Sequence, residues 1–145
     1  VASDNYRANH GFGLALLKEG KIEDAIEYFN KTIRKTPSFA YAYNNRGTAY
    51  AKINLYQKAL DDFNQAIKLK PRYQNAYNNR GIVYYHTGQY QKAVEDLSKA
   101  IYLKPDYVEA YLNRAKIYFK LGQDEQAAQA YNEAMRLNNN RLPRE

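Results

Sequence analysis

Cysteine and tryptophan are absent from this chain of 145 residues, and methionine occurs once. Without cysteine the protein forms neither disulfides nor thiolate-ligated metal sites, which leaves its compartment open. A cytoplasmic location is favoured, and periplasmic or secreted locations stay open. No run of about 18 apolar residues occurs, so no membrane span is expected. No signal peptide is visible, and because the first residue is Val1 we expect a mature form or an excised domain.

Acidic residues are the minority among the charges, with 15 Asp and Glu against 22 Lys and Arg and a net charge of +7. A basic surplus suits an acidic peptide, a nucleic acid or an anionic surface. The basic residues are, however, spread along the chain without a block of like charges, and no nucleic-acid motif appears. We therefore expect a protein or peptide partner, possibly acidic. Nucleic-acid binding is kept as an alternative that steep salt dependence would reveal.

One hexapeptide recurs along the chain. The sequence AYNNRG at residues 42–47 returns unchanged at 76–81 and in weaker form, AYLNRA, at 110–115. The step is about 34 residues each time, which is the period of a helix–turn–helix solenoid repeat. We therefore predict a single domain over residues 1–145, with repeats at about 6–39, 40–73, 74–107 and 108–141.

Each repeat is predicted to contain two helices, which gives an all-α chain of four hairpins. The second helices carry apolar residues at i, i+3, i+4 and i+7, and a proline follows each of the first three, at Pro37, Pro71 and Pro105. Turns are expected at Gly20, Gly88 and Gly122, with Asn54 at the matching place in the second repeat. The polar tail from Asn138 is expected to fray. Ser3 or Asp4 is the expected cap of the first helix.

Small residues recur where two helices of a hairpin should approach closely. They are Gly47, Gly81 and Ala115 on the first helices, and Ala59, Ala93 and Ala127 on the second helices. A larger side chain there would force the helices apart, at a cost of about 1–3 kcal/mol.

The pattern Tyr43, Arg46-Gly47, Tyr50, Ala59, Phe63, Ala66 and Pro71 resembles the signature of the tetratricopeptide repeat family. The departures are an Arg in the usual Leu place and a Tyr for the usual Trp. The first repeat departs most, with Asn9 in the aromatic place and Phe12 in the Arg place. The resemblance implies a right-handed superhelical solenoid of four tetratricopeptide hairpins whose first helices line a concave groove. Such proteins are usually scaffolds that bind peptides or protein partners.

No set of residues indicates an enzyme. Only two histidines occur, His10 and His86, two repeats apart, and the carboxylates of the second helices are interpreted as a solvated charged face. No glycine-rich phosphate loop is present. We therefore predict a non-catalytic protein with no cofactor and no metal site.

The recurring Arg46, Arg80 and Arg114 are predicted to form structural ion pairs rather than an anion-binding row. Because the first repeat lacks both the Arg and the Asp, we expect each Arg to meet the Asp of the preceding repeat. That pairs Arg80 with Asp62 and Arg114 with Asp96, and leaves Arg46 beside Tyr28. A partly exposed pair of this kind adds about 0–1 kcal/mol.

Asn45, Asn79 and Asn113 stand once per repeat in mid-helix, where Asn costs roughly 0.5 kcal/mol relative to Ala. Helix geometry directs this position toward the groove, and in some members of the resembled family an Asn here holds peptide backbone. Simple copying of a duplicated repeat is the alternative explanation. Replacing these residues by Ala is expected to weaken peptide binding while stability holds or rises. The expected groove also includes Tyr41, Asn44, Thr48, Lys52, Asn78, Ile82, Tyr85, Lys116 and Lys120.

A second family site, which holds chaperone C-terminal carboxylates, needs Lys and Asn four residues apart in the first helix. This chain has His10 and Leu14 there, so that site is not expected. The predicted function is therefore a scaffold that holds an extended peptide in the groove, with end-to-end self-assembly as an alternative.

The terminal repeats are expected to be atypical. Asn9 replaces the Tyr of other repeats, and Ala128 replaces Ile26, Leu60 and Val94, so both are expected to reduce exposed apolar surface. Four repeats are accordingly expected to be nearly the full array. Because Tyr131 and Met135 have no following helix, we expect a weak homodimer through the C-terminal helix or a missing capping helix.

Overall fold

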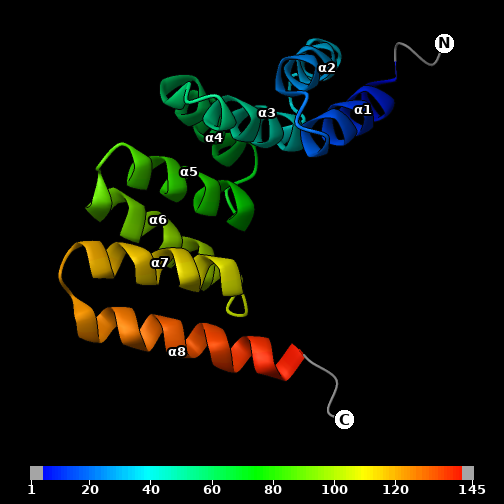
Figure 1. Ribbon diagram of the computed structural model, residues 1–145. Coiled ribbons are helices and arrows are strands. Elements are labelled where there is room, and N and C mark those ends of the chain that lie inside the picture. Colours follow the sequence, from blue (N-terminus) through cyan, green and yellow to red (C-terminus); the bar gives the residue numbers. More distant parts are fainter. Residues whose placement is uncertain (1–4, 142–145) are drawn as a thin grey trace. The chain divides into compact units, whose positions relative to one another are not determined.

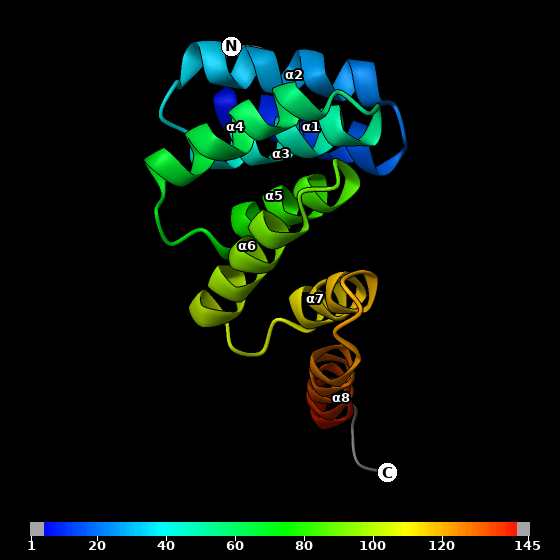
Figure 2. The same cartoon turned by 90° about the vertical axis from the view of Figure 1, so that its left-hand side faces the viewer.

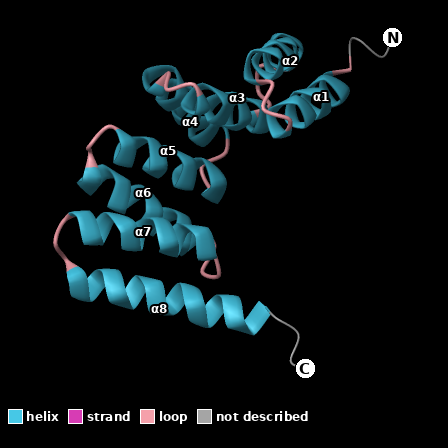
Figure 3. Cartoon of the chain, in the orientation of Figure 1, coloured by secondary structure: helices cyan, strands magenta, loops and turns pink. Residues whose placement is uncertain are grey.

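The computed structural model describes residues 5–141, and within them eight α-helices and no strand occur (Figures 1 and 3). The helices are α1 (Tyr6–Lys18), α2 (Ile22–Lys35), α3 (Ala40–Lys52), α4 (Tyr56–Leu69), α5 (Gln74–His86), α6 (Tyr90–Leu103), α7 (Val108–Lys120) and α8 (Asp124–Arg141). The predicted all-α class and the two helices of each repeat are confirmed. The single domain and the right-handed superhelix stay predictions.

The chain divides into two compact units, Val1–Asn79 and Arg80–Glu145, with the boundary inside α5. In the first unit α1 packs on α2, α2 on α3 and α3 on α4 (Figure 2). Phe29 of α2 and Ala49 of α3 share one buried cluster with Ala25. A second cluster joins Ala40, Ala66, Tyr73 and Ala76. In the second unit α7 packs on both α6 and α8.

The small residues allow the predicted close approach of paired helices. A Cβ atom on Gly47 would lie 2.8 Å from Cε1 of Phe63, and one on Gly81 would lie 3.1 Å from Cγ of Leu97. Side-chain atoms do not tolerate the first distance without a shift of the ring. The recurrent glycine is therefore a packing requirement of the α3–α4 hairpin, whereas at Gly81 an added Cβ would make a tight contact that a small shift of Leu97 could relieve.

The turn residues adopt the backbone that their identity predicts. Gly20, Gly88 and Gly122 all have positive φ, and Asn54 joins them with φ of 62°. This left-handed conformation is open to glycine without strain, and Asn tolerates it better than most residues. The substitution of Asn for Gly in the second repeat therefore preserves the turn.

Three expectations about the ends of the chain need correction. The polar residues from Asn138 to Arg141 are helical, because α8 has no proline to stop it where Pro71 and Pro105 end the other helices. Asn9 is buried, so it does not reduce exposed apolar surface. Ser3 and Asp4 lie outside the described residues, and the side chain of Asn5 caps α1 by accepting hydrogen bonds from the backbone of Arg7 and Ala8.

Candidate functional site

The predicted site residues of the first unit follow one stripe of α3. Tyr41, Asn45, Thr48 and Lys52 are separated by three or four residues, the spacing that places side chains on one face of a helix. Tyr41 and Lys52 are exposed, and Asn45 and Thr48 are half-buried. The stripe therefore combines an aromatic ring, polar groups and a cation on one helix face.

Asn45 and Asn79 make hydrogen bonds to the preceding first helix. Nδ2 of Asn45 donates to Nε2 of His10 at 2.8 Å, and Nδ2 of Asn79 donates to Oδ1 of Asn44 at 3.0 Å. A longer contact of 3.4 Å joins Asn79 to the hydroxyl of Thr48. These Asn side chains therefore connect neighbouring repeats, a structural role that sequence reasoning missed.

Asn44 and Asn78 are not presented to solvent, contrary to expectation. Their exposed fractions are 4% and 5%. Burial of the Asn44 side chain is tolerated because its Oδ1 accepts a hydrogen bond from Asn79, and a buried amide needs such a partner. Asn44 and Asn78 therefore lie in the buried interior of their repeats, and Asn45 and Asn79 lie closer to solvent.

Tyr41 belongs to an aromatic cluster with a cation. Its ring lies 5.4 Å from that of Phe39 and 5.2 Å from that of Tyr73. Nζ of Lys70 donates to the Tyr41 hydroxyl at 2.7 Å and lies 4.9 Å from the centre of the Tyr73 ring. This cluster holds the exposed Tyr41 ring in a defined orientation.

The recurrent arginines form ion pairs inside their own hairpins, so the predicted partners were wrong. Arg46 donates to both carboxylate oxygens of Asp62, at 2.9 and 2.8 Å, and Arg80 does the same with Asp96 at 2.7 Å. Tyr28 is not the partner of Arg46. The structural role is confirmed, because these two-pronged pairs are largely buried.

Burial raises the pKa of Asp62 and of Asp96 above the ordinary value, and hydrogen bonds from Arg46 and Arg80 oppose that effect. Burial also lowers the pKa of His10 below its ordinary 6.5. The bond from Asn45 agrees with this direction, because an amide nitrogen donates and Nε2 must then accept as a neutral ring.

Arg114 lacks the carboxylate that its counterparts use. Ala130 occupies the position of Asp62 and Asp96, and Nε of Arg114 is buried without a hydrogen-bond partner among the described residues. Its Nη1 donates to Ser98 at 3.2 Å, and the rings of Tyr111 and Tyr118 flank the guanidinium.

A small cavity in the second unit brings together three predicted site residues. It has a volume of about 110 Å³, and Tyr85, Asn113 and Lys116 line it. Ile82, His86, Leu97 and Ile117 complete its wall. Sequence reasoning did not place His86 in the groove, although its position next to Tyr85 at the end of α5 was a usable signal. The cavity offers an apolar floor with a cation and an amide at its rim.

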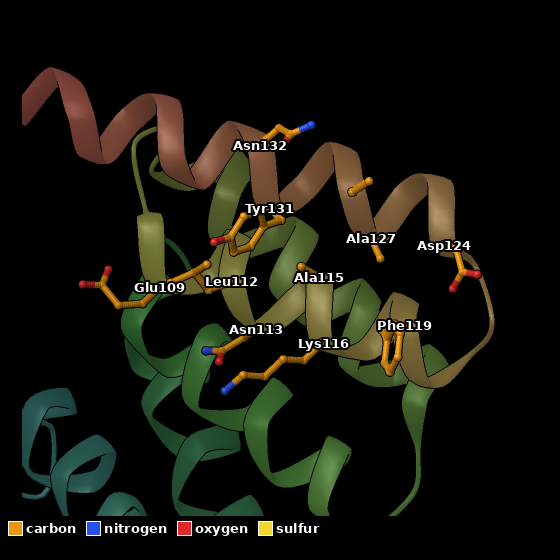
Figure 4. A pocket seen from close by; sticks show the side chains of 11 residues that line it. Glu109, Leu112, Asn113, Ala115, Lys116, Phe119, Asp124, Ala127, Tyr131 and Asn132 are labelled. Carbon is orange, nitrogen blue, oxygen red and sulfur yellow. The ribbon is translucent and has the colours of Figure 1, made fainter.

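A larger apolar pocket of about 710 Å³ lies between α7 and α8 (Figure 4). Asn113 and Lys116 line this pocket as well, together with Leu112, Phe119, Tyr131 and Asn132. Lys120, the remaining predicted residue, is exposed at the end of α7. Sequence reasoning did not include Leu112, Phe119 and Asn132 among the site residues, although each has a counterpart about 34 residues earlier in the preceding repeat.

Within residues 5–141 no group of three or more His, Cys, Asp or Glu could hold a metal ion. In the same part of the chain, no helix is long and apolar enough to cross a membrane.

Comparison with known proteins agrees with this architecture. Tetratricopeptide repeat models match residues 10–73, 63–95 and 108–141, and a TPR repeat model matches residues 83–122. No curated protein matches the chain.

Three solved structures illustrate the similarity. A crystal structure of MamA is 29% identical with a TM-score of 0.85, covering 94% of this chain and 80% of that chain. MamA 41-end from Desulfovibrio magneticus RS-1 is 22% identical with a TM-score of 0.85 and coverage of 97% and 79%, and it shows the fold alone. The first TPR of Spaghetti (RPAP3), bound to the HSP90 peptide SRMEEVD, is 27% identical with a TM-score of 0.78, covering 83% of this chain and 95% of that chain.

Proposed function

Because the chain belongs to the tetratricopeptide repeat family, we propose that it is a non-catalytic scaffold that holds an extended peptide segment against its first helices. A tetratricopeptide fold indicates protein–protein interaction in general. The extended peptide, its acidic character and the residues that contact it are the specific content of the proposal.

The observation that carries the proposal is the cavity of the second unit. Its volume of about 110 Å³ suits one small apolar side chain, and Tyr85 supplies an aromatic wall. Asn113 places a side-chain amide at the rim, and Lys116 can attract a carboxylate. The arrangement suits a short segment with an apolar residue beside an acidic one.

The first unit supports the same mode of binding. Asn79 uses Nδ2 for both of its contacts, so its Oδ1 accepts no hydrogen bond within the described residues. That oxygen remains available to a peptide N–H. The exposed Lys52 adds a cation on the stripe of α3 that also carries Asn45 and Thr48. Asn44 and Asn78 are buried, and we propose that they hold the peptide-contacting residues in place and do not touch the peptide themselves.

The peptide SRMEEVD bound to the RPAP3 domain provides an acidic probe. The family positions for its carboxylate are here His10 and Leu14, and His10 is engaged by Asn45. We therefore expect this chain to bind an acidic internal segment and not to require a terminal carboxylate. Self-assembly and nucleic-acid binding are alternatives, which sedimentation and salt dependence would identify.

The test begins with selection of a displayed random peptide library on the purified chain, followed by calorimetric titration of the selected peptide. Lys116→Glu should weaken binding of an acidic peptide at least about tenfold. Lys99→Glu on α6, which has the same charge change at an exposed site, should leave affinity nearly unchanged. Equal affinity of both variants, or selection of no peptide, would contradict the proposal.

Asn113→Ala should weaken the same peptide by about 0.5–1.5 kcal/mol, the net value of a typical hydrogen bond. Asn45→Ala and Asn79→Ala each also remove a bond between repeats. We therefore revise the expectation that stability holds or rises in these two variants and expect it to fall. Affinity should be read only from variants whose melting curve is intact.

A further inference from the structure

Arg114 has the surroundings of the other recurrent arginines but lacks their carboxylate partner. In the α3–α4 hairpin, Nε and Nη2 of Arg46 both donate to Asp62, at 2.9 and 2.8 Å, and the α5–α6 hairpin contains the same pair. Asp62 follows Arg46 by 16 residues, and the residue at the same distance from Arg114 is Ala130. Alanine has no side-chain acceptor, so the Nε–Nη2 edge of this guanidinium lacks the partner that the other hairpins provide.

The guanidinium of Arg114 holds the same position without that carboxylate. Its Cζ lies 5.4 Å from the centre of the Tyr111 ring and 5.9 Å from that of Tyr118. The corresponding distances from Arg46 to its own two tyrosine rings are 5.7 and 5.8 Å. Nη1 of Arg114 donates to Ser98 on the preceding second helix, as Nη1 of Arg46 does to its own preceding second helix. These matched contacts leave the Nε–Nη2 edge directed at the second helix of the hairpin in both cases.

The place beside this edge is buried and has no counter-charge within residues 5–141. There Nε of Arg114 is buried without a hydrogen-bond partner, and no carboxylate forms an ion pair with this guanidinium. Ala130 is only 4% exposed within the described residues, so its burial does not depend on a further helix. Glu133, one turn after Ala130, accepts from Nε of Arg136 instead. Because a buried cation without a counter-ion is unfavourable, this place favours an anion from outside the chain.

We propose that Arg114 binds a small monocarboxylate anion, of the size of formate, at the edge formed by Nε and Nη2. The two N–H groups of this edge are parallel and match the two oxygens of one carboxylate. The Arg46–Asp62 pair shows that a carboxylate is accommodated against this edge in the same kind of hairpin. The tyrosine rings and Ala130 present apolar surface, so a doubly charged phosphate would cost more to desolvate there.

The size of the ligand follows from the residue that it replaces. Relative to Asp62, Ala130 lacks one carboxylate group, and formate is a carboxylate that carries only a hydrogen. Acetate adds a methyl group that must fit beside the Cβ atom of Ala130, so we expect it to bind more weakly. Chloride offers one acceptor centre in place of two oxygens, so we expect it to be the poorer partner of two parallel donors.

The test follows the arginine Nε–H resonances of the ¹⁵N-labelled whole chain during titration with sodium formate, at an ionic strength held constant with sodium chloride. Arg114→Gln assigns the Arg114 resonance by its loss. Formate should shift this resonance saturably. The resonances of Arg46 and Arg80, whose Nε atoms already donate to carboxylates, should stay in place and serve as internal controls.

A thermal melt provides the second measurement, because a ligand that binds only the folded chain raises the melting temperature. Formate should raise the melting temperature of the wild type above its value in chloride at equal ionic strength. Ala130→Asp should lose this response, since its own carboxylate takes the place of the ligand. Ala128→Asp, which adds the same charge at an exposed site of α8, should keep the response.

The inference is overturned if formate does not move the Arg114 resonance, or if chloride moves it equally, since the site would then not select a carboxylate. It is also overturned if folded Ala130→Asp and Ala128→Asp respond alike to formate. The resonance titration needs only the wild-type fold, so it decides the matter even if Ala130→Asp does not fold. Arg114 is not among the proposed peptide-contacting residues, so these results are independent of the peptide groove.

Discussion

At the scale of single residues, glycine has opposite effects at two places in the first helices. Gly47 faces the ring of Phe63 across the α3–α4 hairpin, whereas Gly11 has open space around the position of a Cβ atom. Both lie within helices, where glycine costs about 1 kcal/mol relative to alanine. The difference between them isolates packing from helix propensity.

We expect Gly47→Ala to lower the free energy of unfolding by about 1–3 kcal/mol, because the added methyl group overlaps the Phe63 ring. Gly11→Ala should instead raise it by up to about 1 kcal/mol. Chemical denaturation of both variants checks this pair. A stabilised Gly47→Ala variant would show that the α3–α4 contact adjusts without cost.

The pKa of His10 gives a prediction about pH. Burial lowers the pKa in the folded state below 6.5, so the unfolded chain takes up a proton first as the pH falls. The free energy of unfolding should therefore decrease as the pH falls from about 6.5 through the lower folded-state pKa. Above pH 6.5 this contribution is constant.

His10→Asn is the matched control for this effect. It places at residue 10 the amide that Asn44 supplies in the next repeat, where the carbonyl accepts from Asn79. The difference in unfolding free energy between wild type and variant should depend on pH only below about 6.5. A difference that stays flat from pH 7.5 to the acid limit of folding would contradict the role of His10.

At the scale of helices, the two middle hairpins are each joined by one buried ion pair between their helices. Arg46 and Arg80 reach an aspartate 16 residues later, and Arg114 finds Ala130 there. The buried Nε of Arg114 is consequently left without an acceptor. The α7–α8 hairpin lacks a contact that the α3–α4 and α5–α6 hairpins have.

Ala130→Asp should supply the missing acceptor and raise the melting temperature, with a gain of about 1 kcal/mol after the cost of burying the carboxylate. Ala130→Asn should give a smaller gain, because its amide carries no charge. A thermal melt of the two variants decides the matter. If Arg114→Ala in the Ala130→Asp background costs no more than in wild type, the new pair does not form.

At the scale of the whole molecule, stability should be distributed by nearest neighbours. Helices of a repeat protein contact only adjacent elements, so a local defect spreads a short distance. Leu97→Ala in the second unit and Phe29→Ala in the first unit both open a cavity at a fully buried position, and each should cost about 2–5 kcal/mol.

Hydrogen exchange should locate the two defects differently. Leu97→Ala should lower protection most in α6 and α7, and Phe29→Ala should lower it most in α1 to α3. This reciprocal pattern follows from local opening of cooperative units. Uniform loss of protection in both variants would instead indicate one cooperative unit over the whole chain.

The sequence alone determined the repeat, the helices and the turns, because these depend on residue spacing and local backbone preferences. The step of about 34 residues, the prolines after the second helices and Asn54 at a glycine position are all visible without a fold. The missing proline near Asn139 also explains the longer α8, although the sequence analysis assigned that tail as frayed.

Only the tertiary structure decided which side chains meet. Sequence spacing allows an arginine of a first helix to pair with the aspartate of its own hairpin or with that of the preceding hairpin. The packing of the helices brings it to the aspartate of its own hairpin. Asn44 and Asn45 are adjacent in sequence, yet one is buried and the other half-exposed, because a helix turns about 100° per residue and the neighbouring helix covers one of them. The same packing leaves Asn132 exposed on α8, whereas its counterparts Asn30 and Ser98 are half-buried.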